Sequence, residues 1–352
     1  MPGKVKVLLA LPMAPELRER IDGVSKRIEV ISLSRGQRLA WREGRPLWAG
    51  YQEPPPSGEE TAKEARERLD ALLAEGEVIL SNPIVPGDIL ERAPMLKWLQ
   101  LTSAGVDRLI DAPVVRSFSV EVTTASGIHA VPISEFVIGG MLAFAKGFPG
   151  ALRAQAEGRW SPYLPEELEG KTVGVLGIGA IGSRVADLAH AFGARVLAVR
   201  RSISSRQKGD GRVSEFLPPA DLPYFLGESD YVVVAVPLTE ESRHMIGEPE
   251  LRSMKPTAIL INIARGAVID EEALTRALKE GWIAGAALDV FEHEPLPPDS
   301  ELWNMPNVLL TPHVSGGTPR YMERAVDLFC DNLHRYLEGR TLRNVVDPER
   351  GY

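Results

Sequence analysis

Short apolar runs alternate with stretches of helical periodicity along most of the chain. In the first hundred residues the expected strands cover Val5 to Leu9, Val78 to Leu80 and Leu96 to Leu101. Helical patterns at Glu16 to Ile21 and Gly87 to Arg92 separate them. This alternation is typical of a parallel sheet flanked by helices. The N-terminal part is therefore expected to form an α/β unit.

One segment, Ser34 to Ser57, departs from this alternation. It contains Trp41, Trp48, Tyr51 and three consecutive prolines, Pro54 to Pro56. We expect an extended loop here, because prolines and isolated aromatic residues give neither strand nor helix periodicity. Two interpretations stay open: a long excursion over the surface, or a loop that lies near a ligand or a partner subunit.

A second and more regular series follows a helical pattern at Pro132 to Ala145 and a polar turn at Leu168 to Lys171. Six strands with helices between them match a full dinucleotide-binding sheet. The chain then closes with a helical pattern from about Pro319 to Leu337. The six expected strands are Val173 to Leu176, Val196 to Val199, Tyr231 to Val236, Ile259 to Ile261, Ala286 to Val290 and Val308 to Leu310.

Length and composition indicate a two-domain globular protein with a small-molecule partner. A chain of 352 residues exceeds the size of one hydrophobic core, and 44% hydrophobic and 25% charged residues are ordinary values. A net charge of −8 without a long basic run argues against nucleic acid or an anionic membrane as partner. Because no apolar stretch reaches bilayer length, and Val5 to Met13 is short and broken by Pro12, no membrane span or signal peptide is expected.

The single cysteine, Cys330, cannot form an internal disulfide. It falls in an amphipathic segment with Ala325, Leu328, Phe329 and Leu333, which favours a buried inert thiol over a nucleophile. This cysteine usage fits a reducing, cytoplasmic compartment. The six histidines are scattered, so no metal site is expected.

A glycine-rich turn joins the strand at Val173 to Leu176 to the helical pattern that follows. Gly177 permits the tight turn, Gly179 lets the backbone approach a pyrophosphate, and Gly182 lets the helix pack on the strand. The helix N-terminus offers N–H groups to the anion. Structural glycine turns also produce such a pattern, but its place between strand and helix favours a dinucleotide. The expected contacts are Gly177, Gly179, Ala180, Ile181 and Gly182.

The next strand ends in Arg200, Arg201 and Ser202, where an NAD-selective site would place a carboxylate for the ribose hydroxyls. Two guanidinium groups and a hydroxyl suit a 2′-phosphate instead, since arginine offers a two-pronged donor to phosphate oxygens. We therefore expect NADP in preference to NAD. The alternative is a solvated strand end with loose selectivity.

Three polar residues follow later strands, at the edge where ligands of open α/β sheets bind. Arg265 can hold a carboxylate, while Glu294 and His313 offer an acid and an imidazole. Each also has a structural explanation: Arg265 as an ion-pair partner, Glu294 as a loop acid before Pro295, and His313 as a capping or core histidine.

Taken together, the ordered motifs resemble the D-isomer-specific 2-hydroxyacid dehydrogenases over nearly the whole chain after about Ser81. The resemblance implies that Arg265, Glu294 and His313 are catalytic. It also implies that Asp289 contacts the nicotinamide carboxamide and that Val236, Pro237, Ile263 and Ala264 line the nicotinamide pocket. Besides the glycine turn, the motifs are Val236 to Thr239, Asn262 to Gly266, Leu288 to Pro295, Thr311 to His313 and Asn344 to Asp347.

The resemblance implies two Rossmann-like or flavodoxin-like lobes, each a parallel sheet flanked by helices, with the cofactor lobe inserted into the substrate lobe. Residues 1–126 and 316–352 would form the substrate domain, and 127–315 the dinucleotide-binding domain, with a cleft between them. Backbone N–H groups of Ser103, Ala104 and Gly105 would receive the substrate carboxylate together with Arg265. Homodimerisation through the region from Phe144 to Trp160 is a further implication.

The reaction implied is the NAD(P)-dependent interconversion of a small 2-keto acid and its D-2-hydroxy acid, with glyoxylate and hydroxypyruvate favoured. Negative charge develops on the keto oxygen during reduction, so the site needs a cation and an acid. Arg265 and His313 would supply them, and Glu294 would orient the imidazole. Two alternatives stay open: a dinucleotide-sensing corepressor-like protein, and a formate or phosphite dehydrogenase of the same family.

Overall fold

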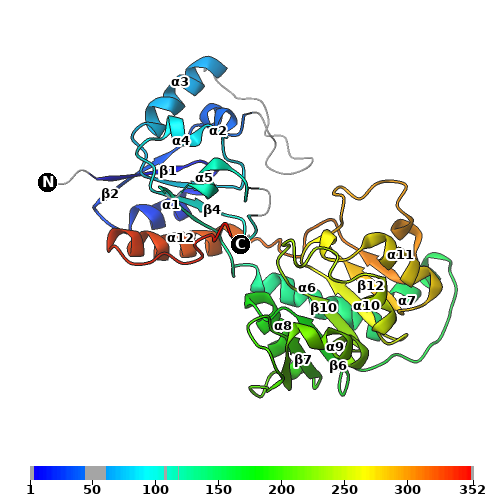
Figure 1. Ribbon diagram of the computed structural model, residues 1–352. Coiled ribbons are helices and arrows are strands. Elements are labelled where there is room, and N and C mark those ends of the chain that lie inside the picture. Colours follow the sequence, from blue (N-terminus) through cyan, green and yellow to red (C-terminus); the bar gives the residue numbers. More distant parts are fainter. Residues whose placement is uncertain (1–3, 44–60, 107–108, 118, 350–352) are drawn as a thin grey trace. The chain divides into compact units, whose positions relative to one another are not determined.

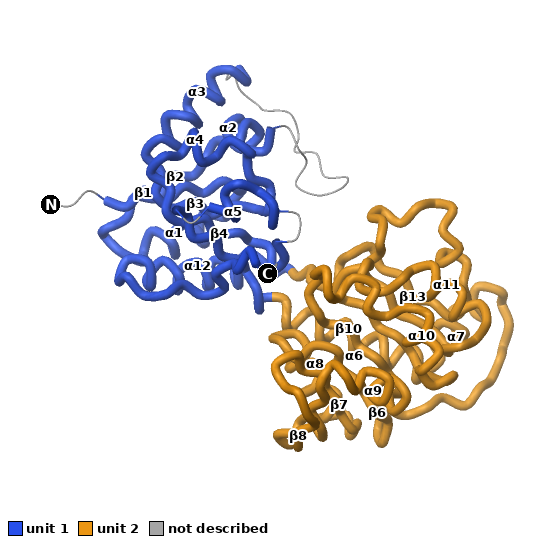
Figure 2. The backbone as a smooth tube through the Cα atoms, in the orientation of Figure 1, with its two compact units in different colours: residues 1–128, 319–352 blue, residues 129–318 orange. Residues whose placement is uncertain are grey.

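The chain is described by a computed structural model that covers residues 4–43, 61–106, 109–117 and 119–349. It divides into two compact units, Met1–Ile128 with Pro319–Tyr352, and His129–Thr318 (Figure 2). The chain therefore leaves unit 1, completes unit 2, and returns to unit 1 at its end. The sequence places the domain boundaries after residues 126 and 315, and the contacts divide the chain after residues 128 and 318.

Unit 1 contains a five-stranded parallel sheet in the order β2-β1-β3-β4-β5 (Figure 1). The sequence predicted β1, β3 and β4 but missed β2 and β5. The strands are β1 Val5–Leu9, β2 Ile28–Ser32, β3 Val78–Ser81, β4 Trp98–Leu101 and β5 Glu121–Thr123. The helices are α1 Pro15–Asp22, α2 Arg35–Trp41, α3 Ala62–Leu73, α4 Ile89–Arg92, α5 Pro113–Arg116 and α12 Tyr321–Leu337.

Alternate residues of the unit 1 strands supply two separate hydrophobic cores. Val7 and Leu9 face α1 and α12, whereas Leu8 faces the side covered by α2 to α5. Trp98 stacks on Phe329 of α12 with ring centroids 5.1 Å apart. Figure 1 shows α12, in red, lying along α1, so the C-terminal helix completes the first unit.

The extended loop predicted for Ser34 to Ser57 is wrong in its first part, because α2 begins at Arg35. Ser34 and Gln37 form a reciprocal capping box that satisfies backbone N–H groups at the helix start. Trp41 is fully buried and donates from Nε1 to Ser81 Oγ over 2.9 Å. The cap stabilises this helix start, although the prolines that follow along the chain favour a loop. Residues 44–57 of the predicted loop lie outside the described residues.

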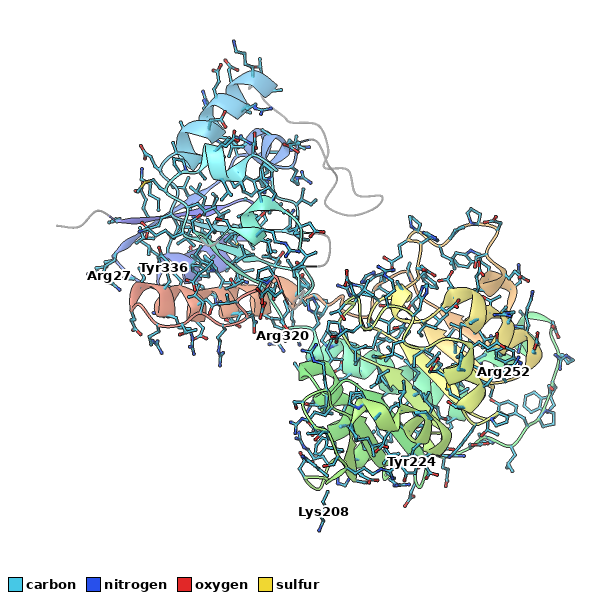
Figure 3. All side chains as sticks on the ribbon, viewed as in Figure 1. Arg27, Lys208, Tyr224, Arg252, Arg320 and Tyr336 are labelled. Carbon is cyan, nitrogen blue, oxygen red and sulfur yellow. The ribbon has the colours of Figure 1, made fainter. Side chains whose placement is uncertain are left out.

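Unit 2 contains an eight-stranded sheet in the order β13-β12-β11-β10-β6-β7-β9-β8, parallel except for the β8–β9 pair. Lys208 of β8 projects outward at its edge (Figure 3). The strands are β6 Thr172–Leu176, β7 Arg195–Val199, β8 Gln207–Lys208, β9 Glu215–Leu217, β10 Tyr231–Val234, β11 Ile259–Asn262, β12 Gly285–Leu288 and β13 Val308–Leu310. The helices are α6 Ala130–Ala145, α7 Phe148–Ala156, α8 Ala180–Ala191, α9 Leu222–Glu228, α10 Glu248–Ser253 and α11 Glu271–Glu280.

The central strands of unit 2, β6, β10, β11 and β12, are buried on both faces, as expected for a sheet covered by helices on both sides. Val233 and Ile261 pack toward α6 and α8, while Val232 and Leu260 pack toward α9 to α11. All six predicted strands are present, and β8 and β9 are additional. Each unit is thus a mainly parallel sheet between helices, which confirms the predicted α/β class.

Cys330 lies on α12, and burial raises the pKa of its thiol to about 11. The thiol therefore stays protonated near neutral pH, which supports the inert interpretation. Among the described helices, none alone has the length and apolar composition to cross a membrane. The pair α6 and α7, bent by 66°, meets that test together by length and composition.

Candidate active site

The glycine-rich turn lies at the position where the strand order of unit 2 reverses. β6 pairs with β7 on one side and β10 on the other, so the turn after β6 and the Val236–Pro237 segment after β10 leave the same edge of the sheet. Open α/β sheets bind ligands at this switch point. Ile263 and Ala264 follow the adjacent strand β11 and are buried. The predicted cofactor segments therefore share one edge of the sheet.

Each glycine of the turn meets a different constraint. Gly177 has φ of +100°, and a Cβ there would lie 2.8 Å from the Ala235 carbonyl oxygen. A Cβ on Gly182 would lie 2.0 Å from the Gly177 oxygen. At Gly179 a Cβ would meet nothing within 4 Å, and no side chain caps the start of α8 there. The backbone is thus open where a pyrophosphate would lie, so these residues fit a dinucleotide.

The residues after β7 are exposed. Arg200 lies over the Phe216 ring, 5.0 Å from its centroid, and Arg201 is 3.9 Å from Glu241. Ser202 is exposed beside them. The segment therefore carries two accessible cations and a hydroxyl, and the partner of Arg201 is an exposed surface acid.

Arg265 follows β11 in a turn built by two neighbours. Asn262 Nδ2 donates to the Arg265 carbonyl over 3.1 Å, and Asn262 Oδ1 accepts from the Ala264 N–H over 3.1 Å. A Cβ on Gly266 would lie 1.8 Å from the Phe291 carbonyl carbon. The turn that carries Arg265 therefore packs closely against the loop that begins after β12. The guanidinium is half-buried and donates to the Ala264 carbonyl over 2.7 Å.

Glu294 and His313 come together from the ends of β12 and β13. His313 Nδ1 is 2.8 Å from Glu294 Oε2, and Glu294 Oε1 accepts from the Phe291 N–H over 3.2 Å. The two side chains are 44% and 24% exposed. A carboxylate on one ring nitrogen fixes the orientation of the imidazole and directs Nε2 away from that contact. The pair thus has the arrangement of an oriented general acid or base.

Asp289 holds the segment that carries His313. Its side chain is fully buried, and its carboxylate accepts hydrogen bonds from Thr311 Oγ1 at 2.6 Å and from the Val314 and Ser315 N–H groups, both at 2.9 Å. The Asp289 carbonyl also accepts from the His313 N–H over 2.8 Å. These bonds fix residues 311–315 around His313, whose φ is +53°. The contact of Asp289 with a nicotinamide carboxamide stays a prediction.

In unit 1, the loop after β4 presents unpaired backbone donors. The N–H groups of Ala104 and Gly105 donate no hydrogen bond within the described chain. Ser103 Oγ donates to the Gly105 carbonyl over 2.9 Å, which closes the turn. Burial raises the pKa of Tyr321, and its neutral hydroxyl donates to the Thr102 carbonyl over 2.6 Å. The Ser103 N–H also donates no hydrogen bond within the described chain, so this loop, held by α12, has three backbone donors available to an anion.

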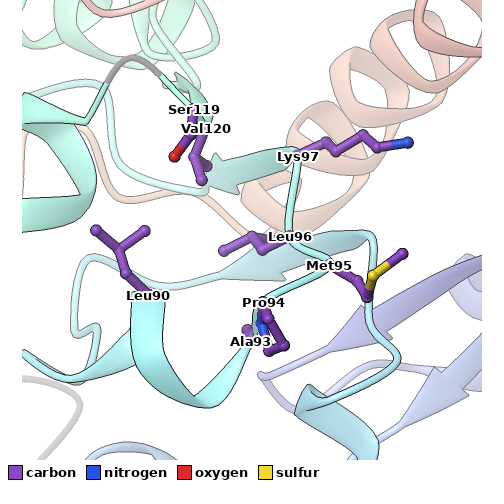
Figure 4. A pocket seen from close by; sticks show the side chains of 8 residues that line it. All are labelled: Leu90, Ala93, Pro94, Met95, Leu96, Lys97, Ser119 and Val120. Carbon is purple, nitrogen blue, oxygen red and sulfur yellow. The ribbon is translucent and has the colours of Figure 1, made fainter.

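A pocket of about 360 Å³ lies elsewhere in unit 1 (Figure 4). Its lining comes from α4 and the segments that precede β4 and β5, including Leu90, Lys97 and Val120. It therefore lies at the amino ends of these strands, opposite the edge that carries Ala104 and Gly105. No cluster of acid and base side chains lines it, so we do not assign the reaction to it.

Sequence reasoning missed the residues that build the turns. Asn262, Gly266 and Thr311 were not assigned roles, yet they shape the segments that carry Arg265 and His313. Their position, at a strand end for Asn262 and within four residues after one for Gly266 and Thr311, was the available signal.

Comparison with known proteins finds a matching family model and relatives over most of the chain. The model of the D-isomer specific 2-hydroxyacid dehydrogenase NAD binding domain matches residues 138–315. Glyoxylate reductase from Korarchaeum cryptofilum is 37% identical over 312 residues, covering 86% of this chain and 89% of the relative. Glyoxylate reductase from Thermofilum pendens is 38% identical over 301 residues, covering 84% and 86%.

Two solved structures are similar over 99% of this chain and 100% of their own. One is a D-isomer specific 2-hydroxyacid dehydrogenase from Xanthobacter autotrophicus in complex with NADPH and MES, with 31% identity and a TM-score of 0.78. The other is an NADPH-dependent glyoxylate/hydroxypyruvate reductase from Sinorhizobium meliloti in complex with NADP and sulfate, with 26% identity and a TM-score of 0.75.

The chain belongs to the D-isomer-specific 2-hydroxyacid dehydrogenase family. It is an oxidoreductase that uses a nicotinamide dinucleotide and acts on 2-keto and 2-hydroxy acids, as the sequence predicted. The comparisons do not favour the corepressor-like or the formate and phosphite alternatives.

Two glycine substitutions should separate cofactor binding from folding. Gly179→Ala should leave the melting temperature nearly unchanged, because its Cβ meets no protein atom, but weaken NADPH binding by about tenfold or more, because the Cβ enters the pyrophosphate position. Gly182→Ala should lower the melting temperature through its clash with Gly177. Thermal unfolding and fluorescence titration measure both effects; unaltered NADPH affinity in Gly179→Ala would contradict the assignment.

Proposed function

We propose that this protein reduces small 2-keto acids of the glyoxylate and hydroxypyruvate type to D-2-hydroxy acids. The observation that carries the proposal is the His313–Glu294 pair, held by the buried Asp289 at the carboxyl edge of the same sheet as the glycine turn. The substrate class is supported by relatives that are similar over most of the chain and are named glyoxylate reductase. The cofactor lobe is unit 2, and unit 1 serves as the substrate lobe.

His313 donates the proton that the keto oxygen needs as its carbonyl is reduced. Glu294 on Nδ1 stabilises the protonated imidazole and keeps Nε2 as the donor. The Arg265 guanidinium stabilises the negative charge that develops on the keto oxygen and attracts the substrate carboxylate. When bound at the glycine turn, a reduced nicotinamide supplies the hydride. In the oxidation direction His313 accepts the hydroxyl proton.

The Ala104 and Gly105 N–H groups receive the substrate carboxylate in this proposal. They are neutral donors that no other group of the described chain uses. Hydrogen bonds from N–H groups to a charged acceptor are stronger than bonds between neutral groups. The Ser103 N–H is the third proposed donor, and the Ser103 hydroxyl also closes the turn by donating to the Gly105 carbonyl.

Substitution at the catalytic pair tests the proposed chemistry. His313→Asn should lower kcat for glyoxylate by about 10²–10⁴-fold, since the proton donor is lost. Arg265→Ala should reduce kcat/KM at least as strongly, with NADPH affinity nearly intact. Steady-state kinetics and cofactor titration measure these effects.

His244→Asn is the matched control. His244 also pairs with a glutamate, Glu292, at 2.9 Å, is likewise 44% exposed, and also has positive φ, at +49°. Its substitution should change kcat less than threefold. An equal loss in both histidine variants would assign the effect to loop structure rather than to proton transfer.

For the cofactor, we infer a preference for NADPH over NADH. The exposed guanidinium groups of Arg200 and Arg201 and the absence of an acid among residues 200–202 support it. The similar structures from Xanthobacter and Sinorhizobium hold NADPH and NADP. A 2′-phosphate would gain charge-assisted hydrogen bonds from these side chains.

Arg200→Asp should shift the ratio of kcat/KM from NADPH toward NADH by about tenfold or more, because the cation is replaced by an acceptor for ribose hydroxyls. Arg195→Asp is the control. Arg195 begins β7, at the end of the strand opposite Arg200, and it pairs with the surface acid Glu228. Kinetics with both cofactors measure the ratio. An identical shift in both variants would reflect net charge alone.

We also infer a homodimer that forms through α7 and the segment after it. Phe148 and Leu152 on α7 are 52% and 62% exposed, and Trp160 and Leu164 are 95% and 93% exposed. Contiguous exposed apolar side chains usually mark an interaction surface. The family resemblance indicates a second copy as its occupant. The cytoplasmic location expected from cysteine usage stays a prediction.

Leu152→Glu should convert the protein from twice the chain mass of 38.5 kDa to the monomer mass, because a carboxylate is desolvated in an apolar interface. Sedimentation equilibrium measures the mass. Lys208→Glu changes an exposed charge on β8 of the same unit and should leave the mass unchanged. A monomeric unsubstituted protein would refute the dimer.

A further inference from the structure

Asn82 carries a buried polar group that the protein itself does not use. The residue is 8% exposed and directly follows β3. Its Oδ1 accepts from the Ile84 N–H over 3.3 Å. Because that N–H can only donate, the bond fixes which end of the amide is oxygen. Nδ2 is buried and has no hydrogen-bond partner in the part of the chain that the structure describes. Such a donor lowers stability unless a ligand satisfies it.

The strand pairing places Asn82 at the ligand edge of unit 1. Ser81 of β3 is in register with Leu101 of β4, and the Thr102 N–H donates to the Ser81 carbonyl over 2.8 Å. Asn82 is therefore the neighbour of Thr102, just before the loop that carries Ala104 and Gly105. On the other side of β3, the Ala10 N–H donates to the Leu80 carbonyl over 2.9 Å.

The same edge is the switch point of the unit 1 sheet. In the sheet, β2 lies on one side of β1 and β3 lies on the other. The connection after β1 therefore runs to one side of the sheet and the connections after β3 run to the other, and the order reverses between β1 and β3. Ligands of such sheets bind outside the carboxyl ends of the strands at this place. An unpaired donor at the end of β3 is thus positioned to contact a ligand that the neighbouring Ala104 and Gly105 N–H groups hold.

We propose that Asn82 determines substrate specificity by donating from Nδ2 to an oxygen on C3 of the 2-keto acid. This rests on the proposed function, in which Ala104, Gly105 and Arg265 take the carboxylate, and Arg265 and His313 take the keto oxygen. The remaining acceptor of a small substrate is then its C3 substituent. The enzyme consequently prefers a 2-keto acid with a C3 hydroxyl, such as hydroxypyruvate, to one with a methyl group, such as pyruvate.

A site built to hydrogen-bond a substrate hydroxyl rejects the analogue that lacks it, because the buried protein donor is then left unpaired. An apolar side chain in place of that donor leaves no unpaired N–H when the methyl analogue binds, so kcat/KM for that analogue is no longer lowered. It also removes the hydrogen bond that stabilises the bound hydroxyl analogue. Glyoxylate has no C3 and provides an internal control.

The experiment compares kcat/KM for hydroxypyruvate, pyruvate and glyoxylate at saturating NADPH in the unsubstituted enzyme, Asn82→Leu and Asn82→Ala. The hydroxypyruvate-to-pyruvate ratio should fall by about tenfold or more in both variants. The value for glyoxylate should change less than threefold. Asn307→Leu is the matched control, because its Nδ2 already donates to the Leu278 and Ala284 carbonyls; it should leave the ratio unchanged.

An equal loss for all three substrates in the Asn82 variants would overturn the proposal in favour of a carboxylate contact or a structural role. An unchanged ratio would overturn it by showing that Asn82 does not contact the substrate. A lowered melting temperature or a lowered NADPH affinity of a variant identifies a folding defect. If the leucine side chain does not fit, the smaller Asn82→Ala variant still tests the proposal. Failure of the proposed function is distinct, since the unsubstituted enzyme would then reduce none of the three acids.

Discussion

The buried carboxylate of Asp289 is the contact on which the arrangement of unit 2 depends. A fully desolvated carboxylate is costly unless hydrogen bonds satisfy it, and here three donors from residues 311–315 do so. Because Asp289 follows β12 and these donors follow β13, the bonds tie two strand ends together. His313 lies within that loop, so its backbone is held in an unusual conformation without a glycine. The pairing of its imidazole with Glu294 follows from this constraint.

The two units contribute different kinds of polar groups. Unit 2 carries the charged ones, Arg265, Glu294 and His313, each in a loop that follows a strand. Unit 1 offers neutral donors, the Ala104 and Gly105 N–H groups and the carboxamide of Asn82. Charged groups suit a step in which charge develops, since their field acts on the transition state. Neutral donors suit recognition, because they hydrogen-bond a carboxylate or a hydroxyl without adding a net charge to the site.

Glycines decide how closely the backbone segments of the cofactor edge approach one another. Gly182 packs against the turn at Gly177, and Gly266 packs against the loop at Phe291. The first contact brings α8 close to β6, and the second sets the Arg265 turn against the segment that leads to Glu294. Gly179 differs from both because the space before it is open. Close packing and an open approach thus coexist within six residues of one turn.

The α/β class, six of the eight strands of unit 2 and the glycine turn could be predicted from the sequence alone, because buried parallel strands are apolar runs and a phosphate turn needs glycines at fixed offsets. It missed β5, β8 and β9, because strands of two or three residues show little periodicity, and it missed α2, whose start depends on a cap between Ser34 and Gln37. It also missed β2, although that strand has five residues. Two features appear only in the three-dimensional structure: Asp289 binds the His313 loop, and Asn82 Nδ2 has no hydrogen-bond partner among the described residues. Hydrogen bonds between residues far apart in the chain depend on strand register and loop geometry, which no local pattern encodes.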